Sequence, residues 1–92
     1  MTEPTAASER SAGWCLYLIE CCNGAYYAGI TNNLAARYAA HACGRGARYT
    51  RANPPIRIVG HRDYPDKASA ARAEWQIRRL RKALKPAFLL ES

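Results

Sequence analysis

Five side chains in this sequence have the chemistry needed to act on a phosphate ester: Tyr17, Tyr27, Arg37, His41 and Glu74. Hydrolysis of a phosphodiester calls for a metal ion, a cation facing the phosphoryl oxygens and a group that takes a proton from water. Glu74 can hold Mg²⁺, a hard ion that prefers carboxylate oxygen. Arg37 can clamp the phosphoryl oxygens, and His41 or a tyrosine can orient or deprotonate the water.

Taken one at a time, these residues also have ordinary structural explanations. Tyrosines are common in sheets, His41 can cap a helix or lie in a core, and Glu74 can form an i, i+4 ion pair with Arg78. A free tyrosine has a pKa of about 10, so Tyr17 or Tyr27 acts as a base only where a neighbouring cation favours the phenolate. The general base is therefore open between a tyrosine, His41 and bulk hydroxide.

The two tyrosines can share a site only if a predicted hairpin has the right register. Two β-rich runs flank an Asn-Gly pair, a strong hairpin signal, at residues 14–20 and 25–30. A two-residue turn would send Tyr17 and Tyr27 to opposite faces of the sheet. A three-residue loop with left-handed Gly24 pairs Tyr17 with Gly29 and Ile19 with Tyr27, and it puts both tyrosines on one face. We predict this second register.

A helix follows the hairpin and carries the arginine and the histidine. Asn33 and the two residues before it are N-cap candidates, and the helix is expected to run through Ala42. Its predicted apolar stripe consists of Leu34, Tyr38 and Ala42. Arg37 and His41 have i, i+4 spacing, so they project from one side of the helix and flank that stripe at the border of the core.

An arginine-rich loop is expected over residues 44–55, and such loops follow phosphate backbones or stack on bases. Its candidate nucleic-acid contacts are Arg45, Arg48, Tyr49 and Arg51. A third strand is predicted over residues 56–61. The order of elements predicts an α+β fold, with a small three-stranded antiparallel or mixed sheet flanked by helices in the order β-β-α-β-α.

The last long helix is predicted over residues 67–84, and Pro86 is expected to stop or kink it. Its apolar stripe is predicted to contain Ala70, Ala73, Ile77, Leu80 and Leu84. Glu74 lies beside that stripe and so borders the core. The apolar residues 88–90 are expected to fold back over an edge of the core.

The composition points to a polyanionic partner. Fourteen Lys and Arg stand against seven Asp and Glu, for a net charge of +7, and no acid occurs between Glu20 and Asp63. No apolar run approaches the roughly 20 residues of a membrane span, so we expect a soluble protein with no membrane association. Four cysteines with no predicted signal peptide indicate a cytoplasmic protein. Residues 1–12 are expected to form a disordered tail and residues 13–92 a single domain, monomeric or weakly homodimeric.

The four cysteines, Cys15, Cys21, Cys22 and Cys43, predict reduced thiols. No C-x-x-C pair occurs, and a zinc site would have to combine His41 and Cys43 irregularly with Cys21 or Cys22. Cys15 lies in a predicted strand, where a small thiol packs well. A zinc-stabilised interaction module is therefore a remote interpretation, which ranks below a nuclease and a non-catalytic nucleic-acid-binding module.

Together these motifs resemble the GIY-YIG endonuclease superfamily, and within it the small stand-alone bacterial members. The two signatures and the later motifs read Cys15-Leu16-Tyr17, Tyr27-Ala28-Gly29, Arg37-x-x-x-His41 and Arg72-Ala73-Glu74. Residues 44–51 look like the loop of the stand-alone group, and the resemblance covers about residues 14–80. Cys15-Leu16 replaces Gly-Ile and Ala28 replaces the middle Ile, and both changes leave the tyrosines and Gly29 intact.

The resemblance implies hydrolysis of nucleic-acid phosphodiesters with a single metal ion, in a pocket formed by the five residues named first. The expected protein is a Mg²⁺- or Mn²⁺-dependent endonuclease with Glu74 as metal ligand, for which DNA is favoured over RNA without excluding RNA, and DNA repair or processing is the candidate role. Its sequence specificity should be low because binding is led by phosphate contacts. The alternative is a non-catalytic basic nucleic-acid-binding module, and the choice among single-stranded, duplex and branched substrates stays open.

Overall fold

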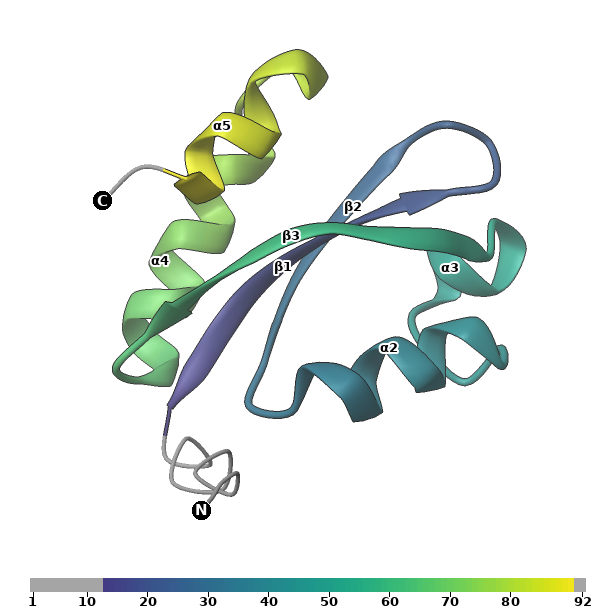
Figure 1. Cartoon of the computed structure of the whole chain (residues 1–92), viewed down its shortest axis with the longest axis horizontal. Helices are drawn as coiled ribbons and strands as arrows, with labels where there is room; N and C mark the ends of the chain where they lie inside the picture. The colour runs from purple at the N-terminus through teal and green to yellow at the C-terminus, as the bar shows by residue number, and fades with distance from the viewer. Residues whose placement is uncertain (1–12, 91–92) are drawn as a thin grey trace.

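The computed structural model describes residues 13–90, so the predicted tail through Ala12 lies outside the described residues. Its centre is a sheet in the order β2-β1-β3, formed by β1 (Trp14–Cys21), β2 (Tyr26–Thr31) and β3 (Pro55–Tyr64). Both strand pairs are antiparallel. The helices α2 (Leu34–Ala42) and α3 (Arg48–Ala52) lie on one side, and α4 (Lys67–Arg78) and α5 (Lys85–Leu90) on the other (Figure 1). The predicted α+β class is confirmed, with a wholly antiparallel sheet.

The β1–β2 hairpin has the predicted three-residue register. Tyr17 pairs with Gly29, and Ile19 pairs with Tyr27. Gly24 has a φ of 87°, the left-handed value that this loop needs and that glycine adopts without strain. Because side chains alternate along a strand, Tyr17 and Tyr27 lie on the same face of the sheet.

The apolar core lies between the opposite face of the sheet and the C-terminal helices. Its buried residues are Leu16, Leu18, Ala28, Ala73, Ile77 and Leu89. Leu16 and Leu18 alternate with Tyr17 along β1, so the tyrosine faces away from this core toward α2. One side of the sheet therefore carries most of the hydrophobic packing, and the other carries the polar residues singled out above.

The predicted apolar stripe of α2 is wrong. The buried residue of this helix is His41, whereas Leu34 and Tyr38 are half-buried and Ala42 is exposed. The reason is that α2 covers the tyrosine face of the sheet and not the apolar core. The residue of α2 that becomes buried is therefore the one that contacts Tyr17, which is His41. The N-cap prediction is right, because the Asn33 side chain accepts a hydrogen bond from the Ala36 amide at 3.1 Å.

The segment predicted as a loop over residues 44–55 contains a short helix, α3, and β3 extends beyond the predicted residues 56–61. Thr50 is the buried residue of α3, with 1% exposure. A single buried threonine leaves no periodic apolar pattern, which is why the sequence does not indicate this helix. The prediction of an irregular loop is therefore corrected for residues 48–52.

The long C-terminal helix predicted over residues 67–84 is also wrong, because α4 ends at Arg78 and is followed by a 3-10 turn, η2 (Lys82–Leu84), and by α5. Leu80 still packs against the core from the segment between α4 and η2, whereas Leu84 is 48% exposed. Pro86 does not end α4. It lies in the first turn of α5, where the missing N–H is not needed.

The C-terminal segment folds back as expected, with Leu89 in the core and Phe88 packed against it, although Leu90 is exposed. Lys85 Nζ donates a hydrogen bond to the Ile77 carbonyl at 2.9 Å and so caps the end of α4. Burial lowers the pKa of this lysine, and the charge of Arg78 adds to the effect. None of the described helices is long and apolar enough to cross a membrane.

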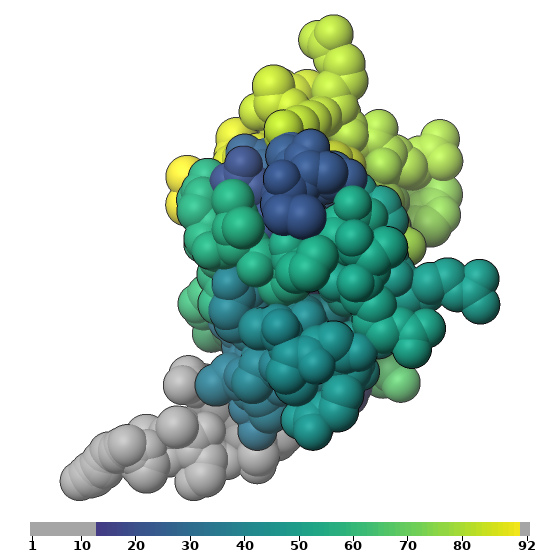
Figure 2. All heavy atoms as spheres, turned by 90° about the vertical axis from the view of Figure 1, so that its right-hand side faces the viewer, coloured from purple at the N-terminus to yellow at the C-terminus, as the bar shows by residue number. Residues whose placement is uncertain are grey.

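The tip of the β1–β2 hairpin is held on two sides. Asn23 Nδ2 donates to Tyr49 Oη at 2.8 Å, and Lys82 Nζ donates to the Gly24 carbonyl. In Figure 2 the blue tip lies between the teal segment of α2 and α3 and the yellow-green C-terminal segment. The hairpin tip thus joins the two helical layers at this end of the molecule.

Candidate active site

A chain of hydrogen bonds runs through the buried layer between the sheet and α2. Tyr17 Oη lies 2.8 Å from His41 Nε2, and His41 Nδ1 lies 2.7 Å from Thr50 Oγ1. His41 is fully buried, and Tyr17 and Thr50 are 2% and 1% exposed. The structure thus brings together a residue from β1, one from α2 and one from α3.

The directions of these hydrogen bonds follow from the donors available. Thr50 Oγ1 donates its only proton to the Ala47 carbonyl at 3.0 Å, so its oxygen accepts from His41 Nδ1. Nε2 of the neutral imidazole then accepts from the Tyr17 hydroxyl. Burial lowers the pKa of His41 below 6.5, and the charge of Arg37 adds to the effect. His41 is therefore neutral at pH 7.

Arg37 comes from α2, one turn before His41, and acts on the same tyrosine. Burial raises the pKa of Tyr17 above 10.0, while a hydrogen bond from Arg37 and its charge lower that pKa. The charges of Tyr27 and Glu74 raise it further. Tyr17 is accordingly a neutral phenol at pH 7, with a guanidinium beside its oxygen.

Two glycines leave the space that the buried pair occupies. A Cβ atom on Gly29 would stand 2.3 Å from Tyr17 Oη, and one on Gly46 would stand 2.2 Å from His41 Nδ1. Real Cβ atoms do not approach other atoms so closely, so a side chain at either position would displace the ring. The space above Gly29 is therefore filled by the Tyr17 hydroxyl itself.

Tyr27 lies beside this chain and faces the outer edge of β2. Its ring meets the His41 ring edge-on at a centroid distance of 5.6 Å and stacks on Tyr49 at 6.0 Å with an interplanar angle of 9°. The Arg78 guanidinium lies 5.8 Å from the Tyr27 centroid. Tyr27 therefore joins the buried histidine to a more open aromatic surface.

Glu74 approaches from α4, on the other side of the sheet. Its Oε2 pairs with Arg78 Nη2 at 3.0 Å, which is the i, i+4 ion pair considered as its structural explanation. Arg78 also donates to the Ala28 carbonyl at 3.0 Å, so this arginine crosses the unpaired edge of β2. The carboxylate is thereby held at the edge where Tyr27 lies, and its charge reaches Tyr17.

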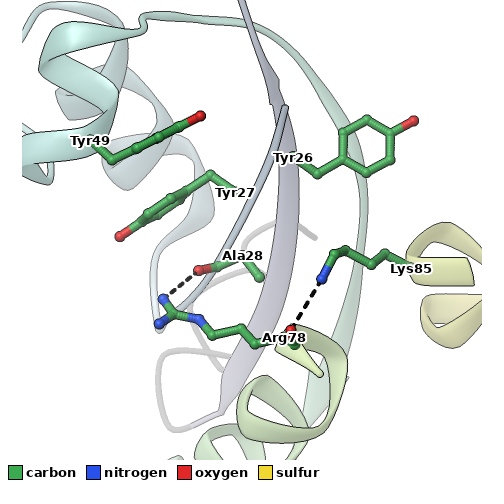
Figure 3. A pocket seen from close by; sticks show the side chains of 6 residues that line it. All are labelled: Tyr26, Tyr27, Ala28, Tyr49, Arg78 and Lys85. Atoms are coloured by element: carbon green, nitrogen blue, oxygen red, sulfur yellow. Dashed lines mark hydrogen bonds between the residues drawn. The ribbon is translucent and has the colours of Figure 1, made fainter. Parts of the chain in front are cut away.

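An open hollow of about 350 Å³ lies over the same edge (Figure 3). Its lining consists of Tyr26, Tyr27, Ala28, Tyr49, Arg78 and Lys85. Three aromatic rings and two cations suit a ligand with flat rings and negative charge. The predicted nucleic-acid contact Tyr49 lines this hollow, and Arg45, Arg48 and Arg51 are exposed on α3 and just before it.

Glu74 has the properties required of a magnesium ligand. Its side chain is 24% exposed, so its hard carboxylate oxygens are within reach of solvent. Mg²⁺ binds proteins through one or two carboxylates and keeps several waters, which substrate phosphates replace. The single carboxylate of Glu74, beside the Arg78 guanidinium, fits that ion.

The motifs alone do not identify Thr50, Gly46 or Arg78. Thr50 and Gly46 act on His41 across a turn whose path only the tertiary structure reveals. The pair of glycines shortly after the histidine is the one signal in the sequence that the backbone approaches a side chain there. Arg78 is suggested by its i, i+4 spacing to Glu74, although the spacing does not show that it crosses the strand edge.

The comparisons with known proteins agree with this geometry. Residues 13–86 match the family model described as "GIY-YIG catalytic domain". A UPF0213 protein of Xanthomonas axonopodis pv. citri (strain 306) is 58% identical over 76 residues, which cover 83% of this chain and 74% of that protein. A UPF0213 protein of Cupriavidus pinatubonensis is 45% identical over 75 residues, or 82% and 83% of the two chains.

One solved structure is also similar, the solution NMR structure of the UPF0213 protein BH0048 from Bacillus halodurans. It is 33% identical, with a TM-score of 0.52 over 85% of this chain and 83% of that chain. The family match spans both tyrosine signatures, the arginine and histidine of α2 and the glutamate of α4. The chain therefore belongs to the GIY-YIG catalytic domain family, a family of nucleases.

Proposed function

We propose that this protein is a divalent-metal-dependent endonuclease that hydrolyses phosphodiester bonds, preferentially in DNA and with low sequence specificity. The observation that supports it best is the buried contact between Tyr17 and His41, with Arg37 acting on the same tyrosine and the charge of Glu74 on α4 also felt there. A histidine buried between two hydroxyls and next to an arginine contributes little to the stability of a core, because every buried polar group needs a hydrogen-bond partner. Such an arrangement is typical of a functional site.

The charged residues have distinct roles in this proposal. Glu74 would hold Mg²⁺ or Mn²⁺, which when bound polarises a phosphoryl oxygen and stabilises the leaving oxygen. The Arg37 guanidinium binds nonbridging oxygens and offsets the charge that develops on them. Tyr27 and Tyr49 form the aromatic wall along which the nucleotide lies.

The proton released by the attacking water needs an acceptor. Tyr17 Oη takes that proton while it gives its own to His41 Nε2, 2.8 Å away. Thr50 keeps the imidazole in the tautomer that leaves Nε2 able to accept. Because Tyr17 and Thr50 engage both ring nitrogens of His41, the histidine acts on the substrate only through Tyr17.

The exposed arginines on and before α3 guide the phosphate backbone, and such contacts carry no sequence information. This favours an enzyme that recognises the shape of DNA rather than a base sequence, as in DNA repair or processing. The four cysteines are thiols without disulfides, which suits a reducing cytoplasm.

The test compares Glu74→Gln with the wild-type protein on labelled single-stranded, duplex and branched DNA and on RNA, in Mg²⁺ and in EDTA. Loss of the metal ligand should slow cleavage by about a hundredfold or more, since a catalytic metal contributes several kcal/mol to transition-state stabilisation. Binding in EDTA should be retained. Gel-resolved single-turnover rates measure the first quantity and fluorescence anisotropy the second.

Glu20→Gln is the matched control. Glu20 is also a partly exposed glutamate paired with an arginine, with its Oε1 2.7 Å from Arg57 Nε and 23% side-chain exposure, but it lies on β1. It should leave cleavage unchanged. Wild-type cleavage in Glu74→Gln would disprove the proposed role of Glu74, and binding without any product in Mg²⁺ or Mn²⁺ would support the non-catalytic alternative.

A further inference from the structure

A second group of metal-binding side chains lies at the end of the sheet where β1 begins. Within residues 13–90, three possible metal ligands cluster there: Cys15, His61 and Asp63, whose ligand atoms all lie within 4.8 Å of one another. We propose that these three residues form a site for Zn²⁺ or a similar borderline transition metal. This site is separate from Glu74 and does not depend on the proposed nuclease activity.

The strand register explains why the three residues meet. In the β1–β3 pair, Cys15 is opposite Asp63, and His61 is opposite Tyr17. Side chains two residues apart on a strand share a face, so all three donors project from the tyrosine face of the sheet. His61 Nδ1 already lies 3.8 Å from Asp63 Oδ1.

The distances among the three donors are close to those of a tetrahedral zinc site. Zinc binds sulfur at about 2.3 Å and nitrogen or carboxylate oxygen at about 2.0–2.2 Å, so tetrahedral ligands stand roughly 3.3–3.8 Å apart. The histidine and aspartate are at that spacing, and rotation of their exposed side chains can bring both toward the cysteine. Two strands of a sheet hold the three backbones in place.

The donor types select the metal. One thiolate, one imidazole and one carboxylate favour Zn²⁺ or Co²⁺ over Mg²⁺, which prefers oxygen alone. Cys15 is 8% exposed at the base of the cluster, while His61 and Asp63 have side chains 50% and 65% exposed, so an ion can enter from solvent. Three protein ligands leave the fourth position to water.

Binding replaces the thiol proton of Cys15 with the metal and releases that proton to solvent, so the affinity rises with pH. A bound ion would fasten the first residues of β1 to the last residues of β3. The folded state would gain stability with increasing zinc, because the unfolded chain does not hold the donors together.

Cobalt is the probe of choice, because thiolate ligation gives a near-ultraviolet charge-transfer band and tetrahedral geometry gives intense visible bands. The reduced full chain should bind one equivalent of Co²⁺ with both signals, and Zn²⁺ should displace it. Cys15→Ser should abolish the charge-transfer band. Asp63→Asn keeps the thiol and should weaken binding at least about tenfold, in line with loss of one ligand.

Cys22→Ser and Cys43→Ser are matched controls, since both remove exposed thiols of the same chain and should leave the spectrum unchanged. Circular dichroism checks that each variant is folded. Absence of the charge-transfer band in the wild-type protein would overturn the site, as would a band that survives Cys15→Ser and is lost in either control.

Discussion

His41 is hydrogen-bonded through both ring nitrogens and fully enclosed, and this has a measurable consequence for stability. The groups around it are Tyr17, Tyr27, Thr50 and Arg37, of which the first three contribute no positive charge. Protonation of the ring would bury a second cation beside the arginine and would break its hydrogen bond from Tyr17. The folded state therefore disfavours the charged imidazole.

The stability of the protein should fall as the pH is lowered from 6.5. In the unfolded chain His41 has its ordinary pKa of 6.5. In the folded state the pKa of His41 is lower, so the ring is protonated only at lower pH. Between these two pKa values the unfolded state holds more protons, so unfolding becomes easier as the pH falls. The contribution of His41 to the free energy of unfolding is fully present above pH 6.5. Below that pH it is lost at no more than about 1.4 kcal/mol per pH unit, the limit for one proton.

Urea unfolding at a series of pH values between 5 and 8, in buffer with EDTA, measures this slope. The variant His41→Gln should lack the contribution, whatever its absolute stability. His61→Gln removes the other histidine of the sequence, which is exposed, and should keep the slope. An equal slope in His41→Gln and the wild-type protein would contradict the buried neutral histidine.

At the scale of elements, the β1–β2 hairpin sets the geometry of the site. Its three-residue loop puts Tyr17 and Tyr27 on one face and Gly29 directly opposite Tyr17. The absence of a side chain on Gly29 lets the Tyr17 ring cross the neighbouring strand and reach His41. The contact between Tyr17 and His41 therefore requires both the register of the hairpin and a glycine at position 29.

Replacing Gly29 with alanine should displace the Tyr17 ring, because the new Cβ would stand 2.3 Å from its hydroxyl oxygen. We expect a loss of about 1–3 kcal/mol in the free energy of unfolding, as for overpacked cores, together with loss of cleavage. Chemical denaturation and the nuclease assay measure the two effects.

Gly60→Ala is the control for this substitution. Gly60 is also a strand glycine paired with β1, but its Cβ would meet a flexible leucine atom of Leu89 at 3.3 Å on the opposite face. It should cost less stability and leave cleavage intact. If the two variants behaved alike, the contact between Gly29 and Tyr17 would not be the cause.

At the scale of the whole molecule, the arginines behind the net charge of +7 differ in whether an acid neutralises them. Glu20 pairs with Arg57 and Glu74 pairs with Arg78, while Arg45, Arg48 and Arg51 are exposed near the aromatic hollow. A polyanion that lies along α3 would meet these arginines and reach Tyr49 at the hairpin tip. Binding there should be led by the release of counterions.

Arg48→Gln and Arg51→Gln should each weaken DNA binding in EDTA and reduce the slope of log affinity against log salt by about 1, as expected for loss of one phosphate contact. Anisotropy titrations between 50 and 300 mM salt measure the slope. Arg79→Gln is the control, because Arg79 is an exposed arginine that stacks on Trp75 of α4, with its Cζ 4.6 Å from the ring centroid. A slope change as large in Arg79→Gln would mean that binding is diffuse.

Local patterns determined the hairpin, its register and the N-cap of α2, because turn chemistry and strand alternation act between residues close in the chain. They also determined the five candidate residues and the α+β class. They misplaced the end of α4, since the apolar period of its sequence continues through Leu80 after the helix has ended. They also misplaced the buried side of α2, where the buried residue is His41.

Only the tertiary structure decided how these parts meet. His41 looks like a residue at the rim of a helix, yet Tyr17 and Thr50 enclose it from segments far away in the chain. Glu74 is held near the free edge of β2 because Arg78 pairs with it and also donates to the Ala28 carbonyl. Such contacts depend on long-range packing and on which strand lies at the edge of the sheet, and neither leaves a periodic signal in the sequence.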